Sequence, residues 1–334
     1  MENGGDALGF WNLQADTSQQ AETWMQHWGL GTFFIQWINY IPSKLLGIPF
    51  WLGNILYGLL SAWAWLTLYD KVKSEVNIQL PAYTQLIWFL PNMHFWTAGV
   101  GKESLIWIFL VLFLLGLNRS KKGLTILGMS LIGMFLIRPL YACFLLFILA
   151  LWLIKNESIS LKRRYTAFAV ILLLLTFVMY ALLQITHIQN LNWEAVSAYL
   201  DFQMQYLKGF NPDSYVPMEN YAWPFAFFTM LFRPMPWEGE GIFFLLAGIE
   251  NLLALLAVMA ALVLGIWKKF IPQIAVIGYG ILFLFFVVFS GSLLLNNFGI
   301  ILRYKSVAMI FLYLWVLNTI FPVLKVILAK QITK

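Results

Sequence analysis

The sequence predicts an all-α, polytopic transmembrane helical bundle with about nine spans, an outer N-terminus, a cytoplasmic C-terminus and interfacial helices on the outer face. Of its 334 residues, 61% are hydrophobic and only 11% are charged, against roughly 45–50% and about 25% in soluble domains. Apolar runs approaching the length that crosses a hydrocarbon core about 30 Å thick recur from Ile48 onward. We therefore expect residues 1–334 to form a single integral membrane domain.

The connections between apolar segments indicate the orientation. Alternate connections contain 14 of the 21 Lys and Arg residues but only three of the 15 Asp and Glu residues. Basic residues concentrate in cytoplasmic loops, which assigns those connections to the cytoplasm. The first 47 residues and the loop 187–241 then lie outside. The nine apolar segments are 48–69, 79–97, 103–118, 123–137, 140–154, 165–186, 242–266, 272–291 and 306–328.

One apolar stretch needs an internal break. As a single helix, the 32 residues from 123 to 154 would be about 48 Å long, and basic residues flank both of its ends. Proline has no N–H donor and clashes with the preceding turn. We therefore expect a break at Arg138-Pro139, with two short helices meeting at the outer face.

Two outer segments are predicted to lie in the membrane interface. In the loop 187–241, Trp193, Val196, Leu200, Met204 and Leu207 recur at helical spacing, after the N-cap residue Asn192 and before Gly209. Residues 30–45 are rich in aromatics, and Pro42 is expected to kink or end that helix. These helices either seal the rim of the bundle or guide a lipid-linked substrate.

The polar N-terminal stretch, residues 1–28, has neither a signal peptide nor a preceding span, yet the topology places it outside. Either the first helix carries this acidic tail across the membrane, or a natural first span precedes residue 1.

Several functional classes are disfavoured. The cytoplasmic connections are short and contain no glycine-rich phosphate loop, which argues against nucleotide-driven chemistry on that side. The single cysteine, Cys143, and the scattered histidines His27, His94 and His187 lack metal-ligand spacing, so no metal or other cofactor is expected. The net charge of +6 follows the membrane topology and does not indicate a nucleic-acid partner.

Charged residues gather at the outer ends of the predicted spans, where charges are costly and often functional. We predict substrate or phosphate binding by five basic residues and one histidine, namely Lys102, Arg138, Arg233, Arg303, Lys305 and His94. The alternative is that the arginines form structural ion pairs with Glu103, Glu238 and Glu250.

Carboxylates are the candidates for acid and base chemistry. Asp6 comes first because it is flanked by glycines and followed by Phe10 and Trp11, whose rings can stack on a sugar, although Gly-Gly-Asp is also an ordinary turn sequence. Glu238 and Glu103 are further candidates. His94 is a weaker candidate base, since a lone histidine among aromatics at a helix end is more often an interfacial residue.

A series of motifs carries a resemblance over nearly the whole chain. They are Gly5-Asp6-x-x-Gly9-Phe10-Trp11, Gly31 to Phe34, Leu90-Pro91-Asn92-x-His94-Phe95-Trp96 with Gly101-Lys102-Glu103, Arg138-Pro139, Phe232-Arg233-Pro234-x-x-Trp237-Glu238, and Asn297-Phe298-Gly299 with Arg303-Tyr304-Lys305. The chain resembles bacterial membrane proteins from surface-polysaccharide gene neighbourhoods, which are similar in layout to GT-C-type glycosyltransferases and O-antigen polymerases.

The resemblance implies polyprenyl-linked sugar donors and an acidic residue in the first outer loop, a role that falls on Asp6. The polymerase resemblance implies outer-loop arginines, a role that falls on Arg138, Arg233 or Arg303. We expect an enzyme of envelope polysaccharide synthesis in the bacterial cytoplasmic membrane. Its partners would be a polyprenyl-phosphate-linked saccharide, membrane lipid and other glycan-assembly proteins. The alternatives are a transporter or flippase of a lipid-linked glycan, and a noncatalytic subunit of a glycan-synthesis complex.

Overall fold

The protein is all-helical throughout the part of the chain that its computed structural model describes. The described residues are 5–14, 22–76, 81–118, 120–157, 159–188, 192–209, 214–268 and 274–332. Within these ranges the backbone forms α-, 3-10 and π-helical segments, and the β-type pairing recorded is one isolated bridge between Tyr215 and Asn297. The predicted all-α class is confirmed.

The chain divides into two compact units, each built from two separate stretches of sequence. Unit 1 comprises Met1–Tyr69 and Phe95–Leu191, and unit 2 comprises Asp70–His94 and Asn192–Lys334. The long helix α3 (Phe50–Glu75) and the short helix α4 (Pro91–Thr97) carry the chain from one unit to the other.

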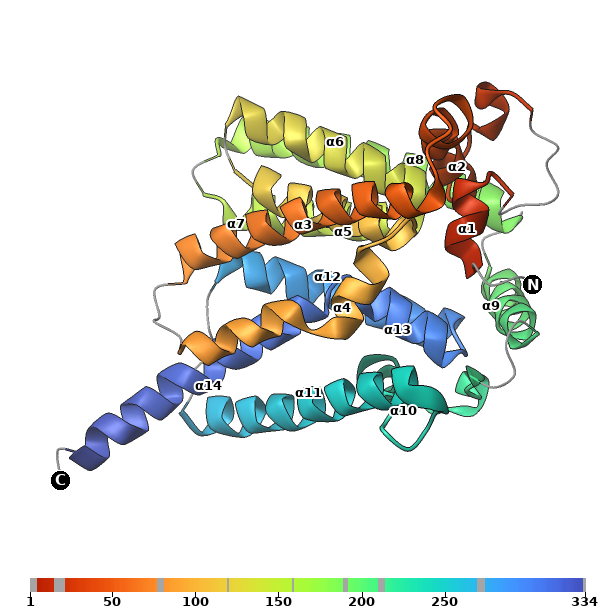
Figure 1. Cartoon of the computed structure of the whole chain (residues 1–334). Helices are drawn as coiled ribbons and strands as arrows, with labels where there is room; N and C mark the ends of the chain where they lie inside the picture. Colours follow the sequence, from red (N-terminus) through yellow and green to blue (C-terminus); the bar gives the residue numbers. More distant parts are fainter. Residues whose placement is uncertain are drawn as a thin grey trace. The chain divides into compact units, whose positions relative to one another are not determined.

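Unit 1 begins with short helices and continues with longer ones (Figure 1). After α3 and α4, the helices α5 to α8 run alongside one another, with α5 on α6, α6 on α7 and α7 on α8. The elements in order are α1 (Gly5–Trp11), η1 (Trp24–His27), α2 (Thr32–Tyr40), η2 (Ile41–Leu45), α3, α4, α5 (Lys102–Gly116), α6 (Lys121–Ile137), α7 (Pro139–Lys155) and α8 (Leu161–Thr186).

The core of unit 1 centres on α5. Trp107 and Phe113 of this helix are fully buried, and the Trp107 ring stacks on Trp65 of α3 with centroids 4.0 Å apart. Packing of α6 on α5 depends on glycine, because the ring of Phe109 lies where a Cβ of Gly133 would be. Small residues allow such close approach between helices where lipid provides little hydrophobic driving force.

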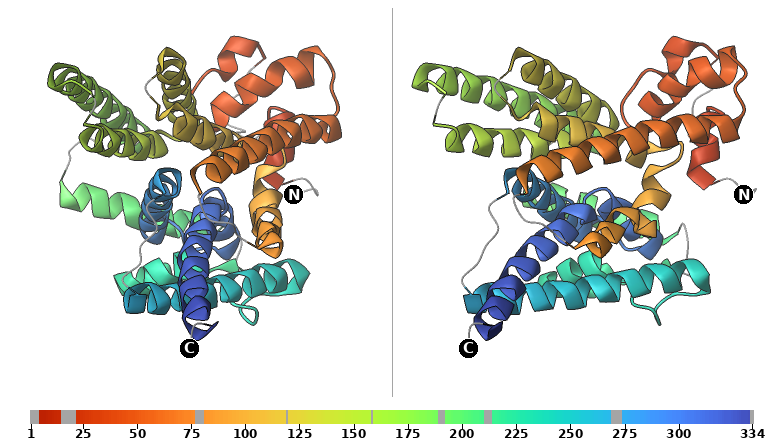
Figure 2. Two further views of the ribbon diagram at one scale, coloured as in Figure 1. Left: turned by 90° about the vertical axis from the view of Figure 1, so that its left-hand side faces the viewer. Right: turned by 60° about the vertical axis from the view of Figure 1, so that its left-hand side comes forward.

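Unit 2 is organised around α14, which packs against α11 and α12 (Figure 2). The α12 contact again uses a glycine, since Phe311 of α14 lies against Gly280. The elements in order are η3 (Ala82–Phe89), α9 (Trp193–Lys208), η5 (Met218–Asn220), α10 (Trp223–Phe232), α11 (Gly241–Lys268), α12 (Ala275–Leu294), α13 (Phe298–Ser306) and α14 (Met309–Ile332).

The predicted break between two short helices is confirmed. Helix α6 ends at Ile137, Arg138 has extended backbone angles (φ −149°, ψ 90°), and α7 starts at Pro139. Proline suits the first position of a helix because the N–H it lacks would have no intrahelical acceptor there.

Both segments that were predicted to form interfacial helices are helical. Asn192 caps α9, accepting a hydrogen bond from the Ala195 N–H, and Gly209 follows its last residue. Trp193 and Phe202 on this helix are exposed, whereas Met204 is buried. Helix α2 occupies the second segment, and the five-residue π-helical turn η2, which contains Pro42, continues it.

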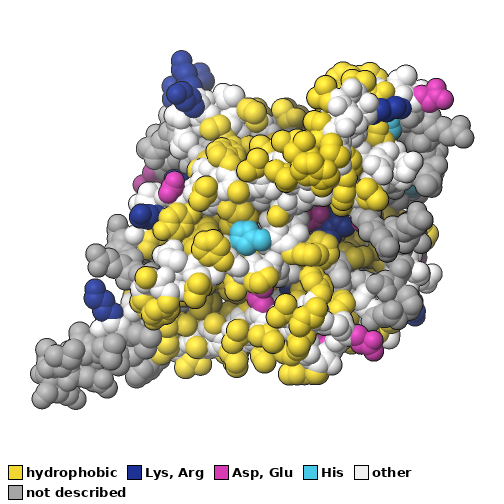
Figure 3. All heavy atoms as spheres, viewed as in Figure 1, with side chains coloured by type: hydrophobic (Ala, Val, Ile, Leu, Met, Phe, Trp, Pro, Cys, Tyr) yellow, Lys and Arg dark blue, Asp and Glu magenta, His cyan; other side chains and the backbone are white. Residues whose placement is uncertain are grey.

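By length and apolar composition, three described helices are able to cross a membrane: α8, α11 and α12. A fourth crossing results if α13 and α14, bent by 63° at their junction, count as one broken span. Large apolar side chains are exposed along α8, where Leu172 and Leu173 are 67% and 71% exposed. Figure 3 shows a face on which hydrophobic side chains predominate.

Several of the other predicted crossings are formed by helices shorter than a full span or by an interrupted segment. Helices α5, α6 and α7 have 15 to 17 residues, a length of roughly 23–26 Å at 1.5 Å per residue. The expectation of one helix over 79–97 is wrong for the described part of that segment, which holds the 3-10 helix η3 and, from Pro91, the separate helix α4. Leu90, before Pro91, is extended, as proline requires of its predecessor.

Candidate functional site

The predicted site residues divide between the two units. Unit 1 contains Asp6, Lys102, Glu103 and Arg138, whereas unit 2 contains His94, Arg233, Glu238, Arg303 and Lys305. Each group is therefore a separate candidate.

In unit 1, Arg138 lies in the break between α6 and α7. Its Nη2 is 3.3 Å from Oε1 of Glu103, and its Nη1 donates to the Tyr141 hydroxyl at 3.0 Å. Glu103, in the first turn of α5, is only 2% exposed. The ion pair thus joins the start of α5 to the start of α7 and fixes the direction of the guanidinium.

Lys102, the first residue of α5, links that helix to α2. Its Nζ donates to Oγ1 of Thr32 at 2.9 Å and lies 5.6 Å from the centre of the Phe10 ring. The neighbouring Gly31 has a φ of +66°, in the left-handed region that glycine tolerates best. The Gly31 N–H donates to the Leu136 carbonyl oxygen at 2.8 Å, which attaches the start of α2 to the end of α6.

These contacts bring the N-terminal ends of three helices, α2, α5 and α7, to one place. We call Thr32, Lys102, Glu103, Arg138 and Tyr141 the three-helix cluster. Each helix N-terminus carries a partial positive charge of roughly +0.5. Together with Lys102 and Arg138, these partial charges outweigh the single carboxylate of Glu103. The arrangement favours an anion, and phosphate oxygens suit a combination of lysine and arginine.

Asp6 lies in the first turn of α1. It is four residues before Phe10, so both side chains share one face of the helix, and the Phe10 ring contacts the Lys102 ammonium group. Helix α1 is anchored, because the Phe10 carbonyl accepts from Asn39 Nδ2 at 3.2 Å and Trp11 Nε1 donates to the Ile48 carbonyl at 3.0 Å. The Asp6 side chain is exposed on this anchored helix.

In unit 2, Arg233 and Glu238 bind each other. Arg233 Nε donates to both carboxylate oxygens of Glu238 at 2.8 and 2.9 Å, and its Nη2 is 2.7 Å from Oε1. Its Nη1 donates to Tyr221 and Thr229, both at 3.2 Å. Burial alone would lower the pKa of Arg233, but the hydrogen bonds to Glu238 and Tyr221 outweigh it and raise the pKa. Arg233 therefore stays charged and well coordinated by the protein.

Lys305 is fully buried in unit 2, and three protein oxygens accept its hydrogen bonds. Its Nζ donates to the carbonyl oxygens of Leu231 and Arg233, each at 3.0 Å, and to Oδ1 of Asn251 at 2.9 Å. An ammonium group has three donors, so these three bonds use its capacity. Asn251 Nδ2 in turn donates to the Pro234 carbonyl oxygen at 2.8 Å. Lys305 and Asn251 thereby hold the segment that carries Arg233, a geometry typical of a structural role.

His94 and Glu250 connect elements of unit 2 to one another. His94 Nε2 is 2.6 Å from the Trp88 carbonyl oxygen, which joins α4 to η3. Glu250 accepts from the Asn92 N–H at 3.3 Å and from the Tyr313 hydroxyl at 3.2 Å. Arg303 lies in the last turn of α13, two residues before Lys305, so the two side chains leave different faces of that helix.

Sequence reasoning missed the neutral residues of both sites. Thr32 and Tyr141 give no charge signal, and only packing of their helices places them beside Lys102 and Arg138. Asn251 was detectable in principle, because a polar residue inside an apolar run is a functional or structural indicator.

Comparison with known proteins finds no matching family model, relative or solved structure. The interpretation of the site therefore rests on its geometry and chemistry.

Proposed function

We propose that the protein transfers or polymerises sugars from a polyprenyl-phosphate carrier on the outer face of the bacterial cytoplasmic membrane, as part of envelope polysaccharide synthesis. The observation that supports this proposal is the three-helix cluster, where Lys102 and Arg138 meet three helix N-termini beside the helix that carries Asp6.

The cluster suits the carrier phosphate. Arg138 is held by Glu103 and Tyr141, so little further ordering is needed when an anion binds. Such preorganised positive charge stabilises the negative charge that develops on a leaving phosphate. Arg233 and Lys305 belong to unit 2, where Arg233 binds Glu238 and Lys305 binds two backbone carbonyls and Asn251.

In the proposed mechanism, an acceptor hydroxyl attacks the anomeric carbon of the carrier-linked sugar. A new glycosidic C–O bond forms while the bond from that carbon to the carrier phosphate breaks. The departing electron pair stays on a phosphate oxygen beside Lys102 and Arg138, and Asp6 accepts the proton of the acceptor hydroxyl. Asp6 is assigned this role because its side chain is exposed on the helix whose Phe10 ring lies beside Lys102.

The proposal includes the topology of nine crossings with an outer N-terminus and cytoplasmic C-terminus. Its support is the distribution of basic residues and the agreement of eight apolar segments with helices α3, α5, α6, α7, α8, α11, α12 and α14. In this proposal the remaining crossing, over 79–97, includes η3 and α4 in succession. Helices shorter than the hydrocarbon core are tolerated if the bilayer thins locally or if neighbouring helices cover them.

The test compares Asp6→Asn, Lys102→Ala and Arg138→Ala with the unaltered protein in a strain that lacks the chromosomal copy. Glycan amount, chain length and carrier-linked intermediates are measured. We expect Asp6→Asn to reduce glycan growth at least a hundredfold, in line with the contribution of general base catalysis, and unextended units to accumulate on the outer leaflet. Asp201→Asn, the same change at an exposed acid of α9, is the matched control and should behave like the unaltered protein.

Normal glycan in all three variants, with the protein inserted at normal abundance, would exclude this site as the catalytic centre. That outcome favours a noncatalytic subunit, an interpretation supported by the internal pairing of Arg233 with Glu238.

A second candidate function is transport of the lipid-linked glycan. The observation that favours it is the 63° bend between α13 and α14, next to the buried Lys305. Broken helices with charged groups are typical of secondary transporters. Accumulation of carrier-linked units on the inner leaflet, rather than the outer one, would identify this function.

A further inference from the structure

A cavity of about 350 Å³ opens beside the C-terminal end of α1, within unit 1. This volume falls in the range of about 300–1,000 Å³ that small-molecule sites occupy. The lining residues are Trp11, Asn12, Leu13, Gln14, Ser43, Lys44, Ile48, Pro49 and Phe50. We call this cavity the Trp11 pocket.

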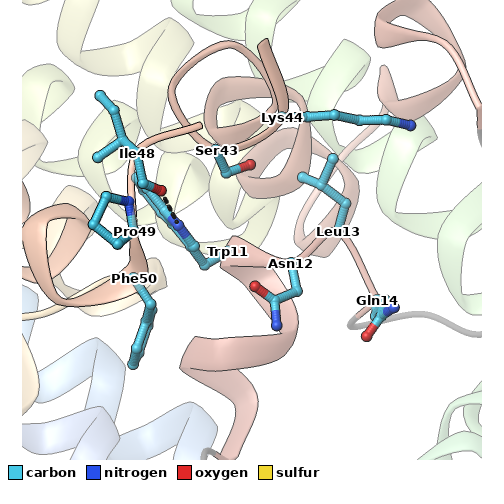
Figure 4. A pocket seen from close by; sticks show the side chains of 9 residues that line it. All are labelled: Trp11, Asn12, Leu13, Gln14, Ser43, Lys44, Ile48, Pro49 and Phe50. Carbon is cyan, nitrogen blue, oxygen red and sulfur yellow. Dashed lines mark hydrogen bonds between the residues drawn. The ribbon is translucent and has the colours of Figure 1, made fainter. Parts of the chain in front are cut away.

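The pocket has an apolar side and a polar side. Figure 4 shows Ile48, Pro49 and Phe50 on one side and Asn12 and Gln14 on the other, with Trp11 between them. Trp11 is 3% exposed, its indole N–H is held by the Ile48 carbonyl, and its ring covers Gly53 of α3. Trp11 is therefore held rigidly and is almost fully covered by protein, and the apolar surface open to a ligand comes from Pro49 and Phe50.

The polar side carries the side-chain amides of Asn12 and Gln14. Asn12 and Gln14 are exposed, and within the described residues no hydrogen bond engages either side-chain amide. Ser43, in contrast, donates its hydroxyl to the Asn39 carbonyl, and Lys44 Nζ donates to the Glu22 carbonyl. The two amides are thus the groups best able to bind a ligand.

The backbone that presents these amides is strained. Leu13, between them, has a φ of +63°, a conformation that branched side chains rarely adopt. It follows the end of α1, where the Gln14 N–H bonds to the Gly9 carbonyl at 2.9 Å. Strained residues of this kind persist where the surrounding structure holds them and are concentrated at binding sites.

A sugar ring matches this combination. Its axial C–H groups pack on aromatic or proline surfaces, while its hydroxyls donate to and accept from side-chain amides, which offer both functions. A single lysine at the rim, already bound to a carbonyl, is a poor match for a phosphate or a nucleotide. We propose that the Trp11 pocket binds a saccharide ring of the glycan substrate.

That the saccharide is a substrate rests on the proposed function, and the position of the pocket fits it. Asp6 and Trp11 lie at opposite ends of the seven-residue helix α1, a separation of roughly 7 Å along its axis. A glycan held in the pocket would place a neighbouring sugar unit close to the proposed base.

The test measures binding without turnover. The purified full chain in lipid nanodiscs, free of sugar-based detergents, is titrated with the methyl glycosides of glucose, galactose, N-acetylglucosamine and glucuronic acid, and saturation-transfer NMR detects contact with the protein. We expect at least one glycoside to bind, and the double variant Asn12→Ala/Gln14→Ala to bind it about tenfold more weakly, since each lost hydrogen bond contributes a factor of a few. Both side chains are exposed, so the variant should fold normally.

A control variant makes the result specific. Gln205→Ala removes an exposed amide from α9 and should leave binding unchanged. The proposal is overturned if none of the four glycosides binds, or if the double variant binds as well as the unaltered protein.

If the proposed function is wrong and the pocket proposal is right, a glycoside binds in the pocket while Asp6→Asn leaves glycan growth intact. Conversely, if Asp6→Asn stops glycan growth but no glycoside binds the unaltered protein, the proposed enzyme activity stands and the proposed saccharide site is excluded.

Discussion

At the scale of single residues, the charged side chains of this protein occupy two kinds of environment. Arg233 and Lys305 are surrounded by protein oxygens, so their main effect is on folding. Asp6 is exposed at the start of an anchored helix. Residue type alone does not separate these environments, because the packing of the helices decides which charged groups are buried.

Lys305→Met should destabilise the protein by about 2–3 kcal/mol, because two backbone carbonyls and Asn251 lose a donor in a buried site. Lowered thermal unfolding midpoints in nanodiscs would be the readout. Lys325→Met, the same change at an exposed lysine of α14, serves as the control. Equal midpoints for the two variants would contradict a structural role for Lys305.

His27 predicts a pH dependence of stability. Burial, and secondarily the nearby Lys44, lower the pKa of His27 below its ordinary value, and its Nε2 has no hydrogen-bond partner among the described residues. A group with a lowered pKa stabilises the folded protein above its unfolded-state pKa, and that stabilisation is lost as the pH falls toward the folded-state value. The midpoint temperature of thermal unfolding should therefore decrease as the pH is lowered below about 6.5. His27→Gln should show a smaller drop, and an identical pH profile would rule out this residue as the cause.

At the scale of elements, glycines decide which helices pack closely. On α6, a Cβ at Gly133 would meet the Phe109 ring at 2.2 Å, whereas a Cβ at Gly128 would meet nothing within 4 Å. On α12, Gly280 faces Phe311 and Gly278 faces open space in the same way. Each unit therefore contains a contact glycine and a free glycine on one helix.

Gly133→Ala and Gly280→Ala should each cost about 1–3 kcal/mol of stability through overpacking. The controls Gly128→Ala and Gly278→Ala should be neutral or stabilising by up to about 1 kcal/mol, because alanine favours helix. Unfolding midpoints of the four variants test the contrast. If the contact and free glycines respond alike, the helix packing described for that unit is incorrect.

At the scale of the whole molecule, the proposed topology predicts which surfaces face the outside. With Cys143 replaced by serine, Glu240→Cys near the start of α11 should react with a membrane-impermeant maleimide in intact cells. Lys121→Cys at the start of α6 should react only after permeabilisation, since positively charged connections stay in the cytoplasm. Glu240 directly precedes α11, and Lys121 is the first residue of α6. The reverse labelling pattern would show that the orientation in the membrane is the opposite one and that Asp6 lies in the cytoplasm.

The sequence by itself determined the all-α class, the helix break at Arg138-Pro139 and the capped helix α9. These features depend on local properties: hydrophobic length, proline's missing N–H and the side chain of an N-cap residue. The single helix expected over 79–97 failed in its described part because hydropathy does not distinguish a continuous helix from η3 followed by α4.

Only the tertiary structure decided which charged residues meet. It pairs Arg138 with Glu103 across 35 residues and bonds Lys102 to Thr32 across 70 residues. It also makes Lys305 a support for the Arg233 segment across 72 residues. Contacts between positions so far apart follow from how helices pack on one another, which composition and periodicity do not encode. The same holds for the Trp11 pocket, whose walls come from α1, η2 and the start of α3.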